Sequence, residues 1–389
     1  MAGIADREAD LVEFRHRLHR NPELSGQEDL TSASIQDFIT AYKPGNLITG
    51  LGGRGIAAEF TGSEPGPRIL LRCDMDALPI NEDMDIPYSS VIDGVSHKCG
   101  HDGHVSILME VAARMHEHPP SQGSVVLLFQ PAEETGEGAR KVIVDSRFKD
   151  IEPDFVFALH NLPGFPLGSI ILRNGVFSSP SRGITVELTG TSSHASQPEK
   201  GNSPVQAISQ LIEAFTSLPQ SALPKDCTAM LTVVHVLLGS RTFGTAPGKG
   251  CVMAVLRTSS TQDMKIISRK AEEAARIIAE THKLECRISW TDEFPITENS
   301  VKAVNTIRSA AGNLSLRIVQ PDVPFPWSED FGHFTEKYPG ALFGIGAGID
   351  TPALHSAKYD FPDELISMGA DIFIEIVNEL LNSPDHIMK

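Results

Sequence analysis

The sequence has no long apolar run. None of its hydrophobic stretches approaches the roughly 20 residues that a membrane-spanning helix needs. Its first residues, MAGIADREADLVEF, carry acidic side chains where a secretory signal carries a basic and then an apolar segment. We therefore expect a cytoplasmic protein that does not cross a membrane.

Basic residues and cysteines are also scarce. The 389 residues include 33 Lys and Arg against 50 Asp and Glu, which gives a formal net charge of −17. A protein that binds nucleic acid needs clustered positive charge, so we expect a small-molecule partner instead. The cysteines are scattered and odd in number, which favours reduced thiols over a disulfide framework. They are Cys73, Cys99, Cys227, Cys251 and Cys286.

The length of the chain exceeds that of one ordinary hydrophobic core, so two domains are expected. Short, wholly apolar runs are typical of strands buried on both faces of a parallel sheet. They occupy residues 69–71, 125–129, 155–159 and 341–345. Apolar residues at helical spacing predict two helices within 6–42 and one each at 105–115 and 363–381. This alternation predicts an α/β domain.

The middle of the chain has a different pattern. It predicts, in order, a strand at 183–189, a helix at 203–218, strands at 228–237 and 251–257, a helix at 261–282 and a strand at 284–290. This β-α-β-β-α-β order is that of a ferredoxin-like unit. We therefore predict a sheet domain formed by residues 1–180 and 293–389, with an α+β domain of residues 181–292 inserted into it.

Side chains that bind metals or move protons follow the predicted strands, where open α/β sheets bind their ligands. They are Asp74 and Asp76 after the first strand, Glu133 and Glu134 after the second, and His160 after the third. A further cluster, HKCGHDGH at 97–104, precedes a predicted helix. The positive end of that helix would favour a thiolate at Cys99.

A thiolate, imidazoles and carboxylates together suit zinc, cobalt, manganese or nickel better than magnesium or calcium. The donors are too many for one tetrahedral ion and fit two divalent metals roughly 3.5 to 4 Å apart. Such a pair polarises a carbonyl and acidifies a bridging water, and a nearby carboxylate then carries the proton to the leaving nitrogen. Adjacent Glu133 and Glu134 can divide these tasks between metal binding and proton transfer.

Nine motifs in one order carry a resemblance that covers nearly the whole chain. They are RHRLHRNPELS (15–25), LRCDMDALPI (71–80), HKCGHDGH (97–104), FQPAEETGEGA (129–139), ALHNLPGFPLG (158–168), SHASQPEKG (193–201), GTAP (244–247), SEDF (328–331) and LHSAKYDFPDE (354–364). With them the sequence resembles the N-acyl-amino-acid amidohydrolases, which include hippurate hydrolases, aminoacylase-like enzymes and hydrolases of indoleacetyl-amino-acid conjugates.

The resemblance implies roles for eight residues. Metal ligands would be Cys99, His101, Glu134, His160 and His355, with Glu133 as general base and acid. Asp76 would orient a metal-bound histidine. His194 would stabilise the negative charge that develops on the substrate carbonyl oxygen, once a lid closes or a partner subunit presents it. The implied fold is a zinc-peptidase-like sheet domain with the ferredoxin-like domain as its lid, and the implied assembly is a homodimer through that lid. The implied substrate is a small N-acyl amino acid.

The chain departs from the family pattern at three places. It has GTAPGKG (244–250) where GTAPN is usual, PEKGNSP (198–204) where PH-x-G-x-DP is usual, and Cys73 where Ala is common. The first two bear on substrate identity, and none removes a metal ligand.

Two other functions are compatible with parts of the pattern. A cysteine-nucleophile hydrolase would use Cys99 with His101 or His104, but it leaves four residues without roles: Glu133, Glu134, His160 and His355. A metal-binding but catalytically degenerate binding protein would retain the ligands and lack turnover.

Overall fold

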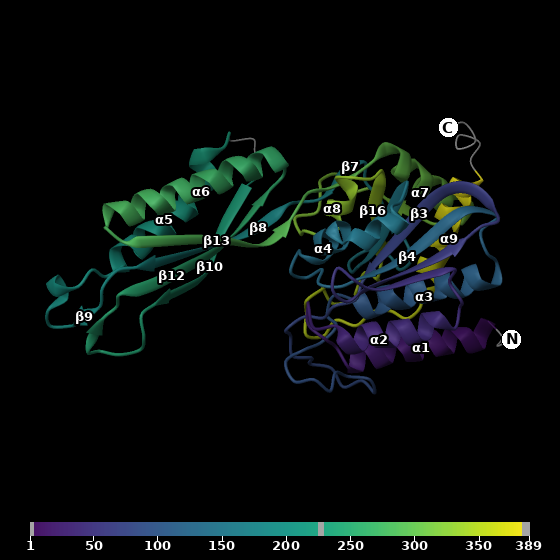
Figure 1. Ribbon diagram of the computed structural model, residues 1–389, viewed down its shortest axis with the longest axis horizontal. Coiled ribbons are helices and arrows are strands. Elements are labelled where there is room, and N and C mark those ends of the chain that lie inside the picture. Colours follow the sequence, from purple (N-terminus) through teal and green to yellow (C-terminus); the bar gives the residue numbers. More distant parts are fainter. Residues whose placement is uncertain (1–3, 225–228, 383–389) are drawn as a thin grey trace. The chain divides into compact units, whose positions relative to one another are not determined.

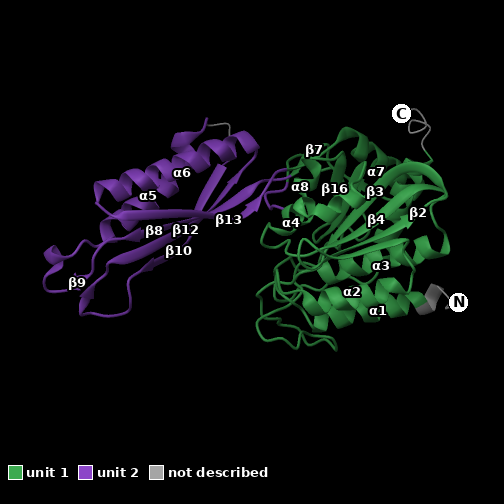
Figure 2. Ribbon diagram, viewed as in Figure 1, with its two compact units in different colours: residues 1–177, 297–324, 330–389 green, residues 178–296, 325–329 purple. Residues whose placement is uncertain are grey.

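The four predicted apolar runs form neighbouring strands in the computed structural model, which describes residues 4–224 and 229–382 (Figure 1). Cys227 and residue 228 of a predicted strand lie outside the described residues, whereas Cys73, Cys99, Cys251 and Cys286 are free thiols. The chain divides into two compact units (Figure 2). Unit 1 comprises the described residues of 1–177, 297–324 and 330–389, and unit 2 comprises those of 178–296 and 325–329.

Unit 1 is built on an eight-stranded sheet of order β1-β2-β4-β3-β5-β16-β6-β15. Its central strands are β4 (Gln122–Gln130), β3 (Glu64–Asp74), β5 (Phe155–Leu162) and β16 (Gly340–Gly346), and they pair in parallel. The outer strands are β1 (Asn46–Leu51), β2 (Gly55–Thr61), β6 (Ile170–Ile171) and β15 (Ile318–Val319). The sequence did not predict the antiparallel β1–β2 hairpin, because β2, GIAAEFT, has little alternation and small side chains.

Helices cover both faces of this sheet. Odd-numbered strand residues such as Leu71, Leu127 and Phe157 join one apolar cluster with α1 (Ile4–Arg20), α2 (Asp29–Thr40), α3 (His101–Glu117), α7 (Val301–Asn313) and α9 (Leu365–Leu381). Even-numbered residues such as Leu70 and Leu128 are equally buried but point to the other face. The short helices α4 (Gly138–Val144) and α8 (Gly332–Thr335) pack there against β4 and β16. The prediction of an α/β domain with a buried parallel sheet is confirmed.

Unit 2 contains β8 (Ser181–Thr189), α5 (Val205–Ala222), β10 (Ala229–Leu238), β12 (Lys249–Thr258), α6 (Thr261–Thr281) and β13 (Glu285–Phe294). Its four strands form an antiparallel sheet of order β10-β12-β8-β13. This is the β-α-β-β-α-β order of a ferredoxin-like unit. Helices α5 and α6 bury alternate strand residues such as Val252, Ala254 and Leu256 on one face of the sheet.

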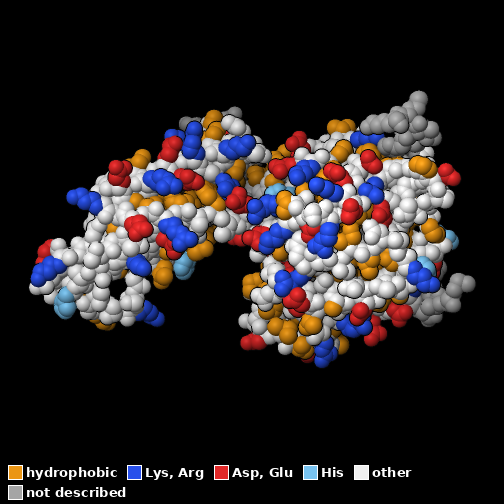
Figure 3. All heavy atoms as spheres, viewed as in Figure 1, with side chains coloured by type: hydrophobic (Ala, Val, Ile, Leu, Met, Phe, Trp, Pro, Cys, Tyr) orange, Lys and Arg blue, Asp and Glu red, His pale blue; other side chains and the backbone are white. Residues whose placement is uncertain are grey.

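A short arm extends from the sheet of unit 2. It consists of β9 (Ser193–His194) paired with β11 (Thr245–Ala246). On the face of the molecule drawn in Figure 3, acidic and basic side chains are interspersed rather than gathered by sign. None of the described helices is long and apolar enough to cross a membrane.

Candidate active site

The carboxyl ends of β4, β3, β5 and β16 meet at one edge of the sheet of unit 1, because these strands are adjacent and parallel. The segments that follow β3, β4 and β16 carry Asp76, Glu133 with Glu134, and His355, and α3 begins at His101. His160 lies inside β5, which continues to Leu162, and not after the strand as the sequence predicted. The topology thereby explains why these distant residues converge.

The five predicted metal ligands form two overlapping groups. Cys99, His101 and His160 make one, and Cys99, Glu134 and His355 make the other, with the candidate donor atoms of each group within 4.8 Å of one another. Cys99 Sγ lies 3.5 Å from His160 Nε2. Glu134 Oε1 lies 3.8 Å from His101 Nε2 and 3.7 Å from His355 Nε2. The two separations from Glu134 Oε1 are too long for hydrogen bonds and leave room for a cation between the donors.

The donors themselves fit such a cation. His101 Nε2 and Glu134 Oε1 are buried and have no hydrogen-bond partner among the described residues. Buried polar atoms without partners are rare, because they keep the full cost of leaving water. His101 Nδ1 lies 2.9 Å from the backbone oxygen of Asp76, and His160 Nδ1 lies 2.9 Å from that of Asn161. Each ring therefore donates its Nδ1–H to a carbonyl and directs its Nε2 atom at the cluster.

The pKa of Cys99 contradicts one expectation. Cys99 stands two residues before the first residue of α3, with Gly100 at the N-cap, and the sequence predicted that this helix end would favour its thiolate. Burial and the nearby carboxylates of Glu134 and Glu133 instead raise the pKa of the Cys99 thiol well above its usual value. Burial and the charges of these carboxylates thus outweigh the partial charge of the helix end.

The same buried, acidic surroundings raise the pKa of Glu134. Burial, partly offset by His101 and reinforced by Asp76, raises the pKa of its carboxyl to about 8. Metal binding requires deprotonated thiol and carboxyl ligands, so the protons held by Cys99 and Glu134 are those that a cation would displace.

Asp76 lies directly behind His101. Its Oδ2 accepts hydrogen bonds from Ser25 Oγ at 2.6 Å and from the Glu134 backbone N–H at 3.0 Å, and its Oδ1 lies 3.3 Å from His101 Nδ1. The carboxylate is fully buried. It contacts both the imidazole of His101 and the turn that carries Glu134.

Glu133 occupies a tight turn after β4. The preceding Ala132 has a left-handed backbone with φ of 53°, and its N–H donates to Glu28 Oε1 at 2.8 Å. Glu133 is 5% exposed, and its Oε1 accepts a hydrogen bond from the Asp330 N–H at 3.3 Å. A carboxylate oxygen of Glu133 lies within 4.8 Å of donor atoms of His101 and Glu134. The turn therefore places a second carboxylate beside the candidate ligands.

A buried polar network beneath the ligands was not predicted. His104 Nδ1 lies 2.6 Å from Asp74 Oδ1, and the other ring nitrogen, Nε2, contacts the Asn161 side chain. Arg72 donates to Asp74 at 2.6 Å and to Asp330 at 2.8 Å. Both ring nitrogens of His104 are thus engaged, which removes it as a base for Cys99. The sequence signals of this network were Asp74 at the end of an apolar strand, His104 in HKCGHDGH and Asp330 in SEDF.

His194 belongs to unit 2 and is described with it. It is exposed at the end of β9, where its Nδ1 accepts the Ser196 backbone N–H at 3.1 Å and lies 2.7 Å from Ser196 Oγ. A neutral imidazole that accepts at Nδ1 carries its proton on Nε2. The arm therefore presents His194 with a donor N–H.

The departure at GTAPGKG has a steric reason. Gly248 approaches the segment just before β9 so closely that a Cβ would lie 2.4 Å from the Ser192 backbone nitrogen. The Gly190 N–H also donates to the Gly248 carbonyl at 2.7 Å. An asparagine at this position would push the β9 segment away.

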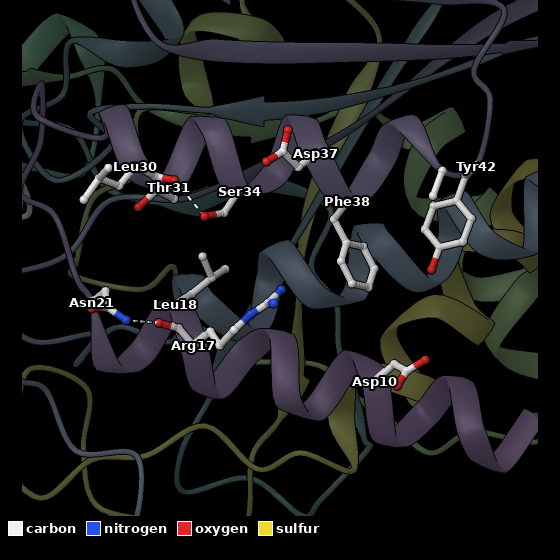
Figure 4. A pocket seen from close by; sticks show the side chains of 11 residues that line it. Asp10, Arg17, Leu18, Asn21, Leu30, Thr31, Ser34, Asp37, Phe38 and Tyr42 are labelled. Carbon is white, nitrogen blue, oxygen red and sulfur yellow. Dashed lines mark hydrogen bonds between the residues drawn. The ribbon is translucent and has the colours of Figure 1, made fainter.

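A separate groove of about 750 Å³ lies between α1 and α2, lined by side chains that include Arg17 and Phe38 (Figure 4). None of the eight predicted site residues lines it.

The comparison with protein families decides the relationship. Residues 70–379 match the model of peptidase family M20/M25/M40. The chain belongs to this family. It is 32% identical over 381 residues to N-acetyl-L-cysteine deacetylase of Bacillus subtilis, with 97% of this chain and 89% of the relative covered. It is 29% identical to hippurate hydrolase of Campylobacter jejuni over 380 residues, with 97% and 98% covered.

Comparison with solved structures gives the same result for the fold. A Bacillus subtilis protein described as a dinuclear metal binding peptidase from the M20 family superposes with a TM-score of 0.80 at 25% identity, covering 98% of this chain and all of that one. A protein from methicillin-resistant Staphylococcus aureus superposes with a TM-score of 0.85 at 24% identity, covering 97% and 98%. The predicted family, fold class and enzyme class, that of a metal-dependent amidohydrolase, are confirmed.

Proposed function

We propose that this M20 protein hydrolyses the amide bond of small N-acyl amino acids to a carboxylic acid and an amino acid, with two divalent metals, zinc, manganese, cobalt or nickel, at the edge of the unit 1 sheet. The observation that carries the proposal is the pair of donor groups that share Cys99 and contain the buried, unpartnered atoms of His101 and Glu134. The names of the deacetylase and hippurate hydrolase relatives support the substrate class.

Five residues would hold the metals: Cys99, His101, Glu134, His160 and His355. Cations bound there would polarise the substrate carbonyl and lower the pKa of the attacking water. The Nδ1–H bonds of His101 and His160 fix the ring orientation that this requires. Asp76 would fix the position of His101 relative to the turn that carries Glu134, because it contacts both.

Glu133 would move the proton. In this role its carboxylate takes a proton from water during attack and delivers it to the nitrogen of the departing amino acid. Burial and the hydrogen bond from the Asp330 N–H hold the carboxylate in one place. Its position beside His101 and Glu134 supports the division of tasks between the two glutamates.

His194 would stabilise the oxygen of the substrate carbonyl as negative charge develops there. The Ser196 contact at Nδ1 supports this role because it leaves the donor N–H at Nε2. In this proposal unit 2 is the lid, and its arm brings His194 to the substrate through closure or from a partner subunit.

A homodimer through unit 2 accords with the surface of β10. This strand lies at the edge of its sheet and exposes Met230, Val234, Val236 and Leu237 by 41% to 56%. An apolar edge strand is a template for pairing with a second strand. Light scattering of wild type and of Val236→Lys would test this assembly, with a monomeric wild type refuting it. The cytoplasmic location stays a prediction.

The experiment that tests the function is a substrate panel. N-acetyl, N-benzoyl and indoleacetyl amino acids, with dipeptides as the comparison class, are incubated with protein loaded with zinc, manganese, cobalt or nickel, and the free amino group released is measured with ninhydrin. Turnover of N-acyl amino acids is expected. Metal binding without turnover of any compound would favour the binding-protein alternative, and turnover by metal-free protein would favour the cysteine nucleophile.

A further inference from the structure

Helix α1 buries an arginine beneath the candidate metal site. Arg15 is 0% exposed, and its Nη1 contacts Asp102 Oδ2 at 3.1 Å and Asp360 Oδ1 at 3.0 Å. Its Nε contacts Asp363 Oδ1 at 2.5 Å. Burial opposes the charge of the guanidinium, but the three carboxylates more than offset this and raise the pKa of Arg15. One buried cation thus joins three acidic side chains.

These carboxylates belong to two segments that are far apart in the sequence. Asp102 directly follows His101 in the first turn of α3. Asp360 and Asp363 follow His355, whose backbone has a left-handed φ of 64°. The two segments carry candidate ligands of both donor groups. Arg15 is therefore a cross-link between them.

Further contacts of the same network reach the backbone of these segments. His19, on the next turn of α1, lies 2.9 Å from Asp102 Oδ2 and 3.0 Å from Glu82 Oε1. Lys98, next to Cys99, donates to Glu82 at 2.5 Å and to the Tyr359 carbonyl at 2.8 Å. The His355 N–H donates to the Lys98 carbonyl at 2.7 Å. The network thus links the backbone next to Cys99 to the segment that begins at His355.

We infer that Arg15 is a positioning residue, which holds the His101 and His355 segments at the separation that the two cations require. The inference rests on the proposed function. Removal of Arg15 would let the two segments move apart, so the affinity for cations would fall. Once cations are forced in at high concentration, the chemical step would proceed near its normal rate, because Arg15 contacts none of the candidate ligands.

A purely structural arginine would behave differently, and the same helix supplies one. Arg7 also lies on α1 and binds acidic residues of α3, Glu110 at 2.9 Å and Glu117 at 2.7 Å. Neither partner adjoins a candidate ligand. Arg7→Met therefore removes ion pairs between the same two helices, at a more exposed position, and serves as the control.

The experiment titrates metal-free protein with Mn²⁺ and Zn²⁺ by calorimetry and records urea unfolding of the same samples. Arg15→Met is expected to weaken cation binding by about 10- to 100-fold, the usual effect of removing a group that orients metal ligands. Arg15→Lys should fall in between, because an ammonium keeps the charge without the planar fork that bridges several carboxylates. Arg7→Met should bind cations within threefold of wild type.

Several results would overturn the inference. One is a cation affinity of Arg15→Met within threefold of wild type, together with a loss of stability in urea like that of Arg7→Met. Another is a kcat that stays low in Arg15→Met at saturating cation. If Arg15→Met does not fold, Asp363→Asn removes one arm at a side chain that is 32% exposed, and unchanged cation affinity there would count equally against it. A wild-type protein that binds no cation would instead refute the proposed function.

Discussion

The exchange of Glu133 for glutamine separates proton transfer from metal binding. Glutamine has nearly the same shape, so its side-chain oxygen can still accept the Asp330 N–H that Glu133 accepts at 3.3 Å. The variant loses only a group that can take up and release a proton. General acid–base catalysis contributes about 10² to 10⁴ in rate. At about 1.36 kcal/mol per factor of ten, this corresponds to a barrier higher by about 2.7 to 5.4 kcal/mol.

The measurement combines steady-state kinetics on the best substrate of the panel with elemental analysis of the same preparation. Glu133→Gln is expected to keep its metals and to lose kcat by that factor. Glu134→Gln should lose metal, because its Oε1 lies between His101 and His355. Glu137→Gln, an exposed neighbour paired with Lys141, is the control and should match wild type. Loss of metal in Glu133→Gln with metal retained in Glu134→Gln would show that the two roles are reversed.

Three further predictions follow from other parts of the site. Purified protein should hold two transition-metal ions per chain and lose activity on chelation. Cys99→Ala should lower the metal content. Full turnover by metal-free protein would contradict the requirement for metal. His194→Ala should lower kcat by about 10² to 10³ with metal content unchanged, so a kcat within twofold of wild type removes the lid-donor role. Burial lowers the pKa of His19, but Asp102 and Glu82 outweigh it and raise the pKa from 6.5 to about 9. At about 1.36 kcal/mol per pKa unit, this difference of 2.5 gives about 3 kcal/mol of stability that is fully present below pH 6.5 and lost as the pH rises through 9. Urea unfolding of metal-free protein from pH 6 to 10 should show this loss in wild type and not in His19→Gln, and parallel curves would exclude it.

Local patterns in the sequence predicted most of the fold. The four apolar runs became β3, β4, β5 and β16 because each is uniformly apolar and can be buried on both faces. The order of strands and helices in the middle of the chain likewise predicted the elements of unit 2. Elements without a strong apolar period, such as β2 and the short arm strands β9 and β11, were missed because neighbouring strands, and not their own sequences, stabilise them.

The candidate donor residues could be identified from the sequence alone, since motifs such as HKCGHDGH and FQPAEE are continuous in the chain. Their electrostatics and the contacts that support them depend on residues that the fold brings together. The thiolate predicted for Cys99 was wrong for the metal-free protein, because burial, together with Glu134 and Glu133, which are distant in sequence, raises the pKa of its thiol. The Arg15 cross-link was invisible for the same reason. Coulombic and hydrogen-bond energies depend on distances in space, and the folded chain places Arg15 beside residues more than 80 positions away.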